Sequence, residues 1–179
     1  MLITLRILPL LLLVSTAALA QGSTEDVLAW SADRKLTWED YKAKPDPNSD
    51  AAASTTTYLS IEYQISNTSF SYTIQSRFSR DRSWGRHKSD YILSHEQGHF
   101  DIAEIFARKL HKEMSAYTFN KKTYQKDLKK IYDKVTDEKE EMQNEYDRET
   151  RHSINKEKQA EWLTRIKRLL EEYSAWANY

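Results

Sequence analysis

The chain has 179 residues, with 27 basic and 27 acidic side chains, 5 histidines and no cysteine. Balanced charge produces no long-range field that would gather nucleic acid or an anionic membrane, so neither is expected as a partner. Without cysteine the chain forms no disulfide and offers no thiolate to a metal. Any metal site must therefore use His, Asp and Glu.

The N-terminus has the pattern of a secretory signal. Arg6 precedes an apolar run over residues 7–14, and small residues follow up to Ala20. The run is shorter than the about 20 residues of a membrane-spanning helix. We expect a signal peptide over residues 1–20, export to the periplasm or the extracellular space, and no membrane attachment after cleavage. An uncleaved signal anchor is the alternative. Residues 21–179 have the size of one domain.

Alternating apolar residues predict a β-hairpin in the first half of the chain. Between residues 55 and 65 the apolar residues alternate, as in a strand with one buried face: Leu59, Ile61, Tyr63 and Ile65 share one face. The turn-forming residues Ser66, Asn67 and Thr68 follow, and the alternation resumes over residues 70–78. These two runs are expected to pair as antiparallel strands.

Beyond residue 90 the spacing of apolar residues becomes helical. A first helix is expected from Asp90 to Tyr117, a second from near Thr123, and a third from about Asn155. The inward stripe of the second helix is apolar up to Met142 and then becomes polar. Strands followed by helices predict an α+β fold, with N-terminal antiparallel strands packed on the first long helix and two further helices.

The first helix carries the sequence His95-Glu96-Gln97-Gly98-His99, an H-E-x-x-H motif. A spacing of four residues brings the two imidazoles to within about 40° of each other and about 6 Å along the axis, so both reach one ion. Glu96 is turned about 100° from His95, where it can take a proton from water rather than act as a ligand. Neutral imidazoles suit zinc, and this arrangement most often hydrolyses peptide bonds.

The alternative interpretation is that both histidines are core residues satisfied by hydrogen bonds. It requires two polar rings one turn apart on an apolar stripe, and an unpaired buried polar group costs about 1–3 kcal/mol. Binding of a metal removes this cost. The sequence therefore favours a zinc site that includes His95 and His99.

The sequence around the motif resembles a bacterial secreted family known as domain of unknown function 922, described as zinc-dependent proteases. Three parts carry the similarity: residues 94–104, residues 36–41 together with 51–57, and residues 146–162. The family pattern has glycine after its last histidine, where this chain has Ser153. The resemblance implies an extracytoplasmic zinc peptidase but supplies no substrate. We expect a zincin-like version of the α+β fold.

A catalytic zinc usually has three protein ligands and a water, so a third ligand is expected. If the second helix folds back antiparallel, Glu145 lies level with the two histidines. His152 lies further along the polar continuation of the same stripe, in the family-like segment, and is the favoured third ligand. Asp147 and Glu149 are the remaining candidates, as ligands or as residues that orient one.

Two further expectations concern the neighbourhood of the third ligand. A break in the second helix near residues 150–153 would let His152 reach the ion. Tyr146 is a candidate hydrogen-bond donor to a developing oxyanion, although packing in the core is the commoner role for such a tyrosine.

The sequence thus predicts an exported zinc-dependent hydrolase, a peptidase with Glu96 as general base and a peptide or protein as substrate. An edge strand of the hairpin over residues 55–78 could pair with an extended peptide beside the metal. The alternative is a non-catalytic exported domain that binds metal or another protein, in which Glu96 is an incidental helix carboxylate.

Overall fold

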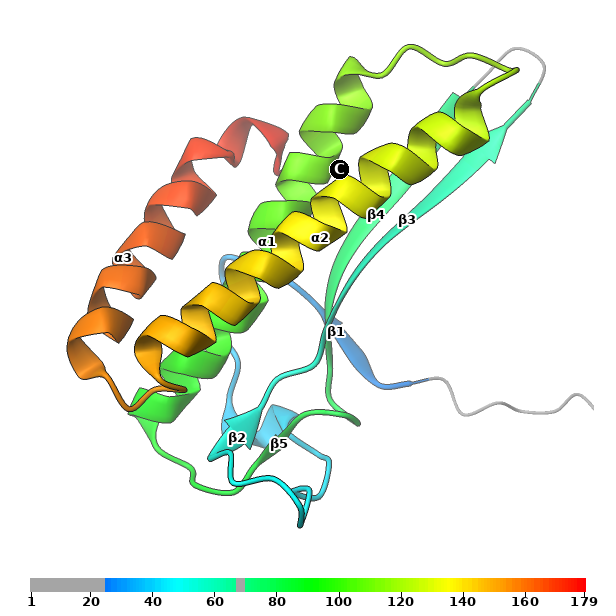
Figure 1. The fold of residues 1–179 in the computed structure, drawn as a ribbon. Helices are drawn as coiled ribbons and strands as arrows, with labels where there is room; N and C mark the ends of the chain where they lie inside the picture. The colour runs from blue at the N-terminus through cyan, green and yellow to red at the C-terminus, as the bar shows by residue number, and fades with distance from the viewer. Residues whose placement is uncertain (1–24, 67–69) are drawn as a thin grey trace, which may run out of the picture.

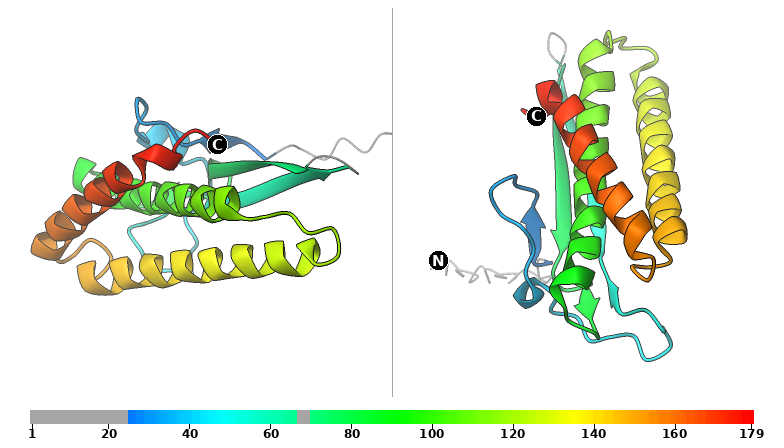
Figure 2. Two further views of the ribbon diagram at one scale, coloured as in Figure 1. Left: turned by 90° about the horizontal axis from the view of Figure 1, so that it is seen from above. Right: turned by 90° about the vertical axis from the view of Figure 1, so that its left-hand side faces the viewer.

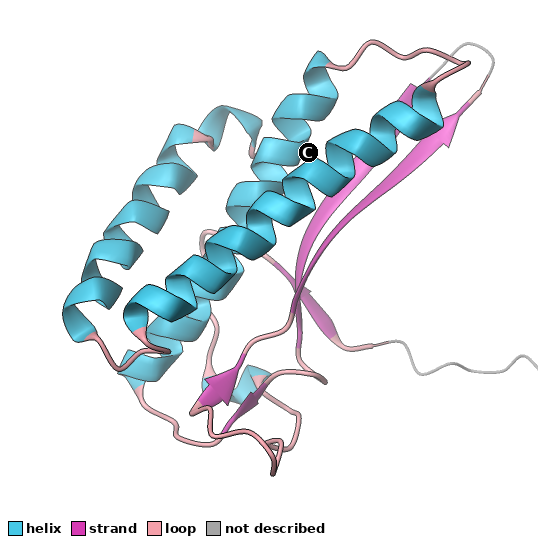
Figure 3. Cartoon of the chain, in the orientation of Figure 1, coloured by secondary structure: helices cyan, strands magenta, loops and turns pink. Residues whose placement is uncertain are grey.

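The computed structural model describes residues 25–66 and 70–179 and shows an α+β fold of antiparallel strands and three long helices (Figure 1). The expected signal segment over residues 1–20, and Asn67 and Thr68 of the expected turn, lie outside the described residues. In the described part, none of the helices combines the length and apolar character needed to cross a membrane. Strands occupy the first half of the chain and helices the second, as the change of period at residue 90 predicts (Figure 3).

The main sheet has three antiparallel strands in the order β1-β4-β3. Its strands are β1 (Val27–Ala29), β3 (Thr57–Ile65) and β4 (Phe70–Ser79). β3 and β4 pair from Thr57 opposite Phe78 to Ile65 opposite Phe70, which confirms the predicted hairpin. Tyr63 was expected on the buried face but is 46% exposed, because it borders a groove between β3 and the second helix.

A second, smaller sheet lies at one end of the molecule. It pairs β2 (Ala53–Ser54) with β5 (Trp84–Gly85) in antiparallel fashion. Figure 1 shows these strands beside the start of the first helix and the end of the second. The residues just before β3 therefore approach the segment that carries the H-E-x-x-H sequence.

The three predicted helices are confirmed as α1 (Asp90–Ala116), α2 (Tyr124–Thr150) and α3 (Lys156–Glu172). Ser89 caps the start of α1 by accepting a hydrogen bond from the backbone N–H of Ile92, and Asn155 caps α3 through Lys158 in the same way. α1 contacts the main sheet and both other helices, and Figure 2 shows it between the sheet and α2.

Because it is covered on several sides, α1 is buried around most of its circumference in its middle turns. The core includes the apolar residues Ile102, Ala103, Ile105, Phe106, Ala107 and Leu110, none more than 2% exposed. Charged residues in the same turns are paired: Arg108 Nε donates to Glu104 Oε1 at 2.8 Å. Such a rigid helix holds its N-terminal half, with the motif, in one position.

Polar side chains hold the segment that follows β1 against α1. Trp30 Nε1 donates to Asp101 Oδ1 at 2.7 Å, and Gln97 Nε2 donates to the same oxygen at 2.8 Å. Gln97 Oε1 in turn accepts the backbone N–H of Leu36 at 2.8 Å. Gln97, at the first variable position of the motif, thus docks the N-terminal segment onto the helix.

Replacing Asp101 with alanine should therefore destabilise the protein. The change removes a buried carboxylate that accepts hydrogen bonds from Trp30, Gln97 and Lys35, so the free energy of unfolding should fall by about 1–3 kcal/mol in urea or thermal melts. Asp133→Ala is the matched control, since within the described residues the carboxylate of Asp133 pairs with Lys129 alone, on the surface of α2. That control should change stability by less than about 0.5 kcal/mol. Equal effects of the two changes would contradict the docking role.

Candidate metal centre

His95 and His99 project from one face of α1 toward a single oxygen of α2. Their ring centroids lie 4.9 Å apart, and each Nε2 is 3.1 Å from Oδ1 of Asp147. His95 is buried, while His99 and Asp147 are partly buried. The three donor atoms lie within 4.8 Å of one another, and no thiolate competes with them. They form a group that could hold a metal ion.

α2 presents two residues to this group, one helical turn apart. Asp147 faces both imidazoles, and Gln143 faces His99 alone. Gln143 Nε2 donates to the backbone carbonyl of His99 at 2.9 Å, so its Oε1 is the acceptor that faces His99 Nδ1. The bonds of Gln143 therefore place a hydrogen on Nδ1 of His99.

This tautomer has a consequence for the other side of the ring. In a neutral His99 with hydrogen on Nδ1, the lone pair is on Nε2 and points at Asp147 Oδ1, which is also an acceptor. Two acceptors 3.1 Å apart repel unless a proton or a metal cation lies between them. The protein groups are thus arranged for a positive charge at this point.

The titration behaviour of the group agrees with this requirement. Burial opposes the charged form of Asp147, but hydrogen bonds from His95 and His99 outweigh it and hold the pKa of that carboxyl well below its ordinary value. Burial likewise opposes a charged His99, but its contact with Asp147 raises the pKa of His99 above its ordinary value. Both shifts favour a negative carboxylate beside a positive centre.

His95 is held by packing instead of a second hydrogen bond. Its Nδ1 is buried and has no hydrogen-bond partner among the described residues. The ring of Tyr146 stacks on it with centroids 4.5 Å apart and an angle of 24°. Tyr146 reaches this position because residue 98 is glycine: a Cβ there would lie 2.6 Å from the tyrosine hydroxyl oxygen. Gly98, at the second variable position of the motif, thus makes room for Tyr146.

Glu96 lies beside the two histidines and is fixed by a chain of hydroxyl groups. Thr55 Oγ1 donates to Glu96 Oε2 at 2.6 Å, and Tyr41 lies 2.9 Å from the same Thr55 oxygen. Because the threonine hydrogen goes to the carboxylate, Tyr41 donates to Thr55. Burial and the charge of Glu96 raise the pKa of Tyr41, which keeps this hydroxyl protonated. Glu96 Oε1 has no bond to any described residue and is left for a ligand.

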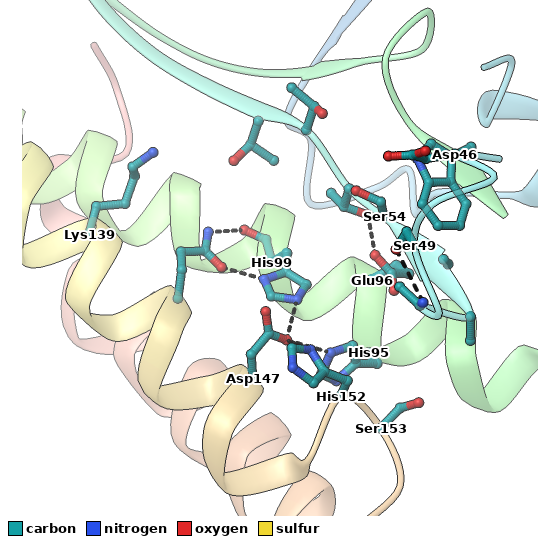
Figure 4. Close-up of a pocket in the computed structure, with 18 residues that line it drawn as sticks. Asp46, Ser49, Ser54, His95, Glu96, His99, Lys139, Asp147, His152 and Ser153 are labelled. Carbon is teal, nitrogen blue, oxygen red and sulfur yellow. Dashed lines mark hydrogen bonds and ion pairs between the residues drawn. The ribbon is translucent and has the colours of Figure 1, made fainter. Parts of the chain in front are cut away.

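These groups line a cleft of about 600 Å³. One wall is the extended segment of residues 51–57, which includes β2, and the opposite wall comes from α1 and α2. Figure 4 shows His95, His99, Asp147 and His152 gathered on one side, with Glu96 across from Ser54. The donor group is therefore open to a molecule that enters between the helices and β2.

His152, the favoured third ligand, lies next to the donor group but outside it. Its Nδ1 is 3.4 Å from Asp147 Oδ1, and its side chain is 73% exposed. The expected break is present, because α2 ends at Thr150 and residues Arg151, His152 and Ser153 all have positive φ. Ser153, which stands where the family pattern has glycine, has φ 71°, a left-handed conformation that favours glycine. The turn brings His152 to the edge of the cleft.

The other candidates lie elsewhere or are already bonded. Glu145 pairs with Arg165 of α3 at 3.2 Å, and Glu149 accepts from Trp162 Nε1 at 2.8 Å, so both face α3. Tyr146 is fully buried and donates to the backbone carbonyl of His95 at 3.2 Å. This arrangement favours its packing role over a role as oxyanion donor.

Sequence reasoning missed Gln143 and Thr55. Gln143 lies one turn before Asp147, so a face of α2 carrying residues 143 and 147 was a signal in the sequence. Thr55 lies in a run of small and hydroxyl residues, and nothing in that run marks a contact with Glu96.

Comparison with known proteins gives one match. A family model described as "Bacterial protein of unknown function (DUF922)" matches residues 16–153, a range that contains every residue of the donor group and His152. No curated protein and no solved structure gives a significant match to the chain.

The close contact at residue 98 predicts the sign of a mutation. In an open helix Gly→Ala is stabilising by about 1 kcal/mol. Here the new methyl group would collide with the tyrosine ring, so Gly98→Ala should instead lower stability by about 1–3 kcal/mol. In a Tyr146→Leu background, the same change should cost much less, and comparison of melts of the four proteins gives the coupling. A more stable Gly98→Ala protein would contradict the contact.

Proposed function

This chain belongs to the DUF922 family of bacterial proteins of unknown function, and we propose that it is a zinc-dependent hydrolase that cleaves peptides or proteins. The observation that carries the proposal is the convergence of His95, His99 and Asp147 on one point, with Glu96 beside them. The proposal includes the zincin-like arrangement expected from the sequence and export from the cytoplasm, which follows from residues 1–20.

The donor group fits zinc. Ligand atoms at about 2.0–2.2 Å from a tetrahedral ion lie about 3.3 Å from one another. The distances of 3.1 Å from Asp147 Oδ1 to each imidazole nitrogen are close to this value. Two neutral imidazoles and one carboxylate are ligands that zinc takes in hydrolases. His95, His99 and Asp147, which all line the cleft, would hold the ion.

When bound, zinc would supply a Lewis acid and lower the pKa of a water molecule to about 7. The protein's own residues would transfer the proton. Glu96 accepts from Thr55 through Oε2, which leaves Oε1 to take the proton of the water and pass it to the leaving amine. The chain from Tyr41 through Thr55 fixes the carboxylate, so that little reorganisation is needed during the reaction.

A peptide substrate suits the shape of the cleft. β2 pairs with β5 on one side, and its segment, residues 51–57, forms the wall opposite Glu96. An extended peptide that adds to a strand edge gains main-chain hydrogen bonds. We propose that the substrate lies along this segment, which puts a carbonyl of its backbone near the metal group. The relevant edge is then β2 and the start of β3.

Zinc content and affinity test the ligands. The purified protein should bind about one zinc per chain, and Asp147→Ala should weaken binding by more than the about 10–100-fold of a supporting residue. Elemental analysis and competition with a chelating dye measure both quantities. Glu145→Ala is the control, because Glu145 pairs with Arg165 and should leave affinity unchanged.

His152→Ala separates the two candidate ligands. If Asp147 is the third ligand, His152→Ala should lose less zinc affinity than Asp147→Ala. Collapse of zinc binding in His152→Ala, with near-native binding in Asp147→Ala, would restore His152 as the third ligand. Absence of zinc in the reloaded wild-type protein would remove the hydrolase proposal and favour histidines held only by hydrogen bonds.

Glu96→Gln tests catalysis separately from binding. The amide is close in size to the carboxylate but cannot accept a proton, so the variant should keep zinc and lose nearly all hydrolysis of an unfolded protein. The wild-type protein should lose the same activity when a chelator is added. Unchanged turnover in Glu96→Gln would refute the assigned base. If wild-type protein loaded with zinc cleaves no peptide in a diverse library, the non-catalytic alternative is correct.

A further inference from the structure

Lys139 gives the cleft a positive charge that the proposed chemistry does not use. It lines the cleft together with the acidic residues Asp46, Glu96 and Asp147, and no other lysine or arginine is among the lining residues. Figure 4 shows its side chain at one side of the cleft, nearer to His99 than to His152. The charge therefore lies beside the path of a bound molecule.

The position of Lys139 follows from the geometry of α2. Residues 139, 143 and 147 are spaced by four, so they share the face that lines the cleft. Eight residues of helix span about 12 Å, which is the length of about four residues of an extended peptide. With the reach of its own side chain, Lys139 can meet a group two to four residues from the metal position.

Lys139 is partly buried and lacks an ion pair within the described residues. The two neighbouring acids do not neutralise it at contact distance: Glu138 lies 3.7 Å from Lys109, and Glu140 is exposed. Burial lowers the pKa of Lys139. Two other lysines of α2 are paired: Lys129 with Asp133 and Lys134 with Glu113.

A desolvated cation without a partner is costly, and an anion that binds in the cleft would remove the cost. A lysine whose carbon chain only covers apolar surface is the alternative. Methionine, which has a similar length and no charge, would cover apolar surface equally well. The two interpretations therefore differ in what the charge does for a ligand.

We propose that Lys139 binds a carboxylate of the substrate, so that the cleft selects peptides with an acidic group two to four residues from the cleaved bond. This inference rests on the proposed peptidase function. The carboxylate comes from an aspartate or glutamate side chain or from the end of the peptide chain. Both sources offer the same group to the lysine.

The test compares matched peptides cleaved by the zinc-loaded protein. Glutamate is moved along a neutral peptide, with glutamine at the same position as reference, and each sequence is made with a free and an amidated C-terminus. At one position the glutamate peptide should have a kcat/KM at least about tenfold higher, since a charged hydrogen bond contributes about 1.5–3 kcal/mol. A preference that follows the free C-terminus instead identifies the terminal carboxylate as the ligand.

Lys139→Met should reduce this acid-to-amide ratio to about one, and Lys139→Glu should reverse it in favour of lysine-containing peptides. Lys130→Met is the control, because Lys130 is an exposed lysine of the same helix outside the cleft, and it should keep the ratio. Circular dichroism and melting temperature show whether each variant is folded. A wild-type ratio near one at every position, or a ratio that persists in folded Lys139→Met, overturns the inference.

Binding separates this inference from the proposed function. Labelled acidic and amide peptides are titrated into zinc-loaded Glu96→Gln and into Glu96→Gln with Lys139→Met, and fluorescence anisotropy is recorded. If acidic peptides bind more tightly than amide peptides only when Lys139 is present, and the wild-type protein cleaves no peptide, the carboxylate site is supported and the peptidase function is refuted. If the wild-type protein cleaves peptides but neither binding nor cleavage depends on Lys139, the peptidase function is supported and the carboxylate site is refuted.

Discussion

The contact between Gly98 of α1 and Tyr146 of α2 is the constraint on which the site depends. Because residue 98 has no side chain, the ring of Tyr146 lies against the helix and stacks on His95, and its hydroxyl group donates to the backbone carbonyl of His95. Once this contact is fixed, the helical period of α2 sets the positions of its neighbours. Asp147 then faces both imidazoles and Gln143 faces His99. A larger separation of the two helices would leave the donor atoms too far apart to share one ion.

Much of the fold was predictable because periodicity reports burial directly. The hairpin over residues 55–78 and the three helices follow from alternation and from helical spacing, and their ends agree with Ser89 and Asn155 as capping residues. The H-E-x-x-H sequence also identifies its own geometry, because residues four apart share a face of any helix. These features are local, so a single sequence is sufficient to read them.

The partner of the two histidines was harder to predict, because α2 has more than one buried face. The inward stripe that includes Met142, Glu145 and Glu149 faces α3, as the contacts of the two glutamates with Arg165 and Trp162 show. The side facing the cleft carries Gln143 and Asp147, which are polar and resemble a solvent-exposed face in sequence. Counting residues along two antiparallel helices placed the correct turn of α2 beside the histidines. It could not determine which side of that turn faces them. Thr55 comes from a segment whose position is set only by the tertiary fold.

The packing of α3 shows that the folded unit extends beyond the part of the chain that matches the family. The family match ends at residue 153, before α3 begins. Nevertheless Trp162 packs on Tyr146 with centroids 5.4 Å apart, and Gln159 donates to Ser94 Oγ and the carbonyl of Tyr91. A chain cut at the end of the match would uncover the outer side of the tyrosine that supports His95. Substitutions that affect the donor group through Tyr146 can therefore arise in a helix that lies outside the family match.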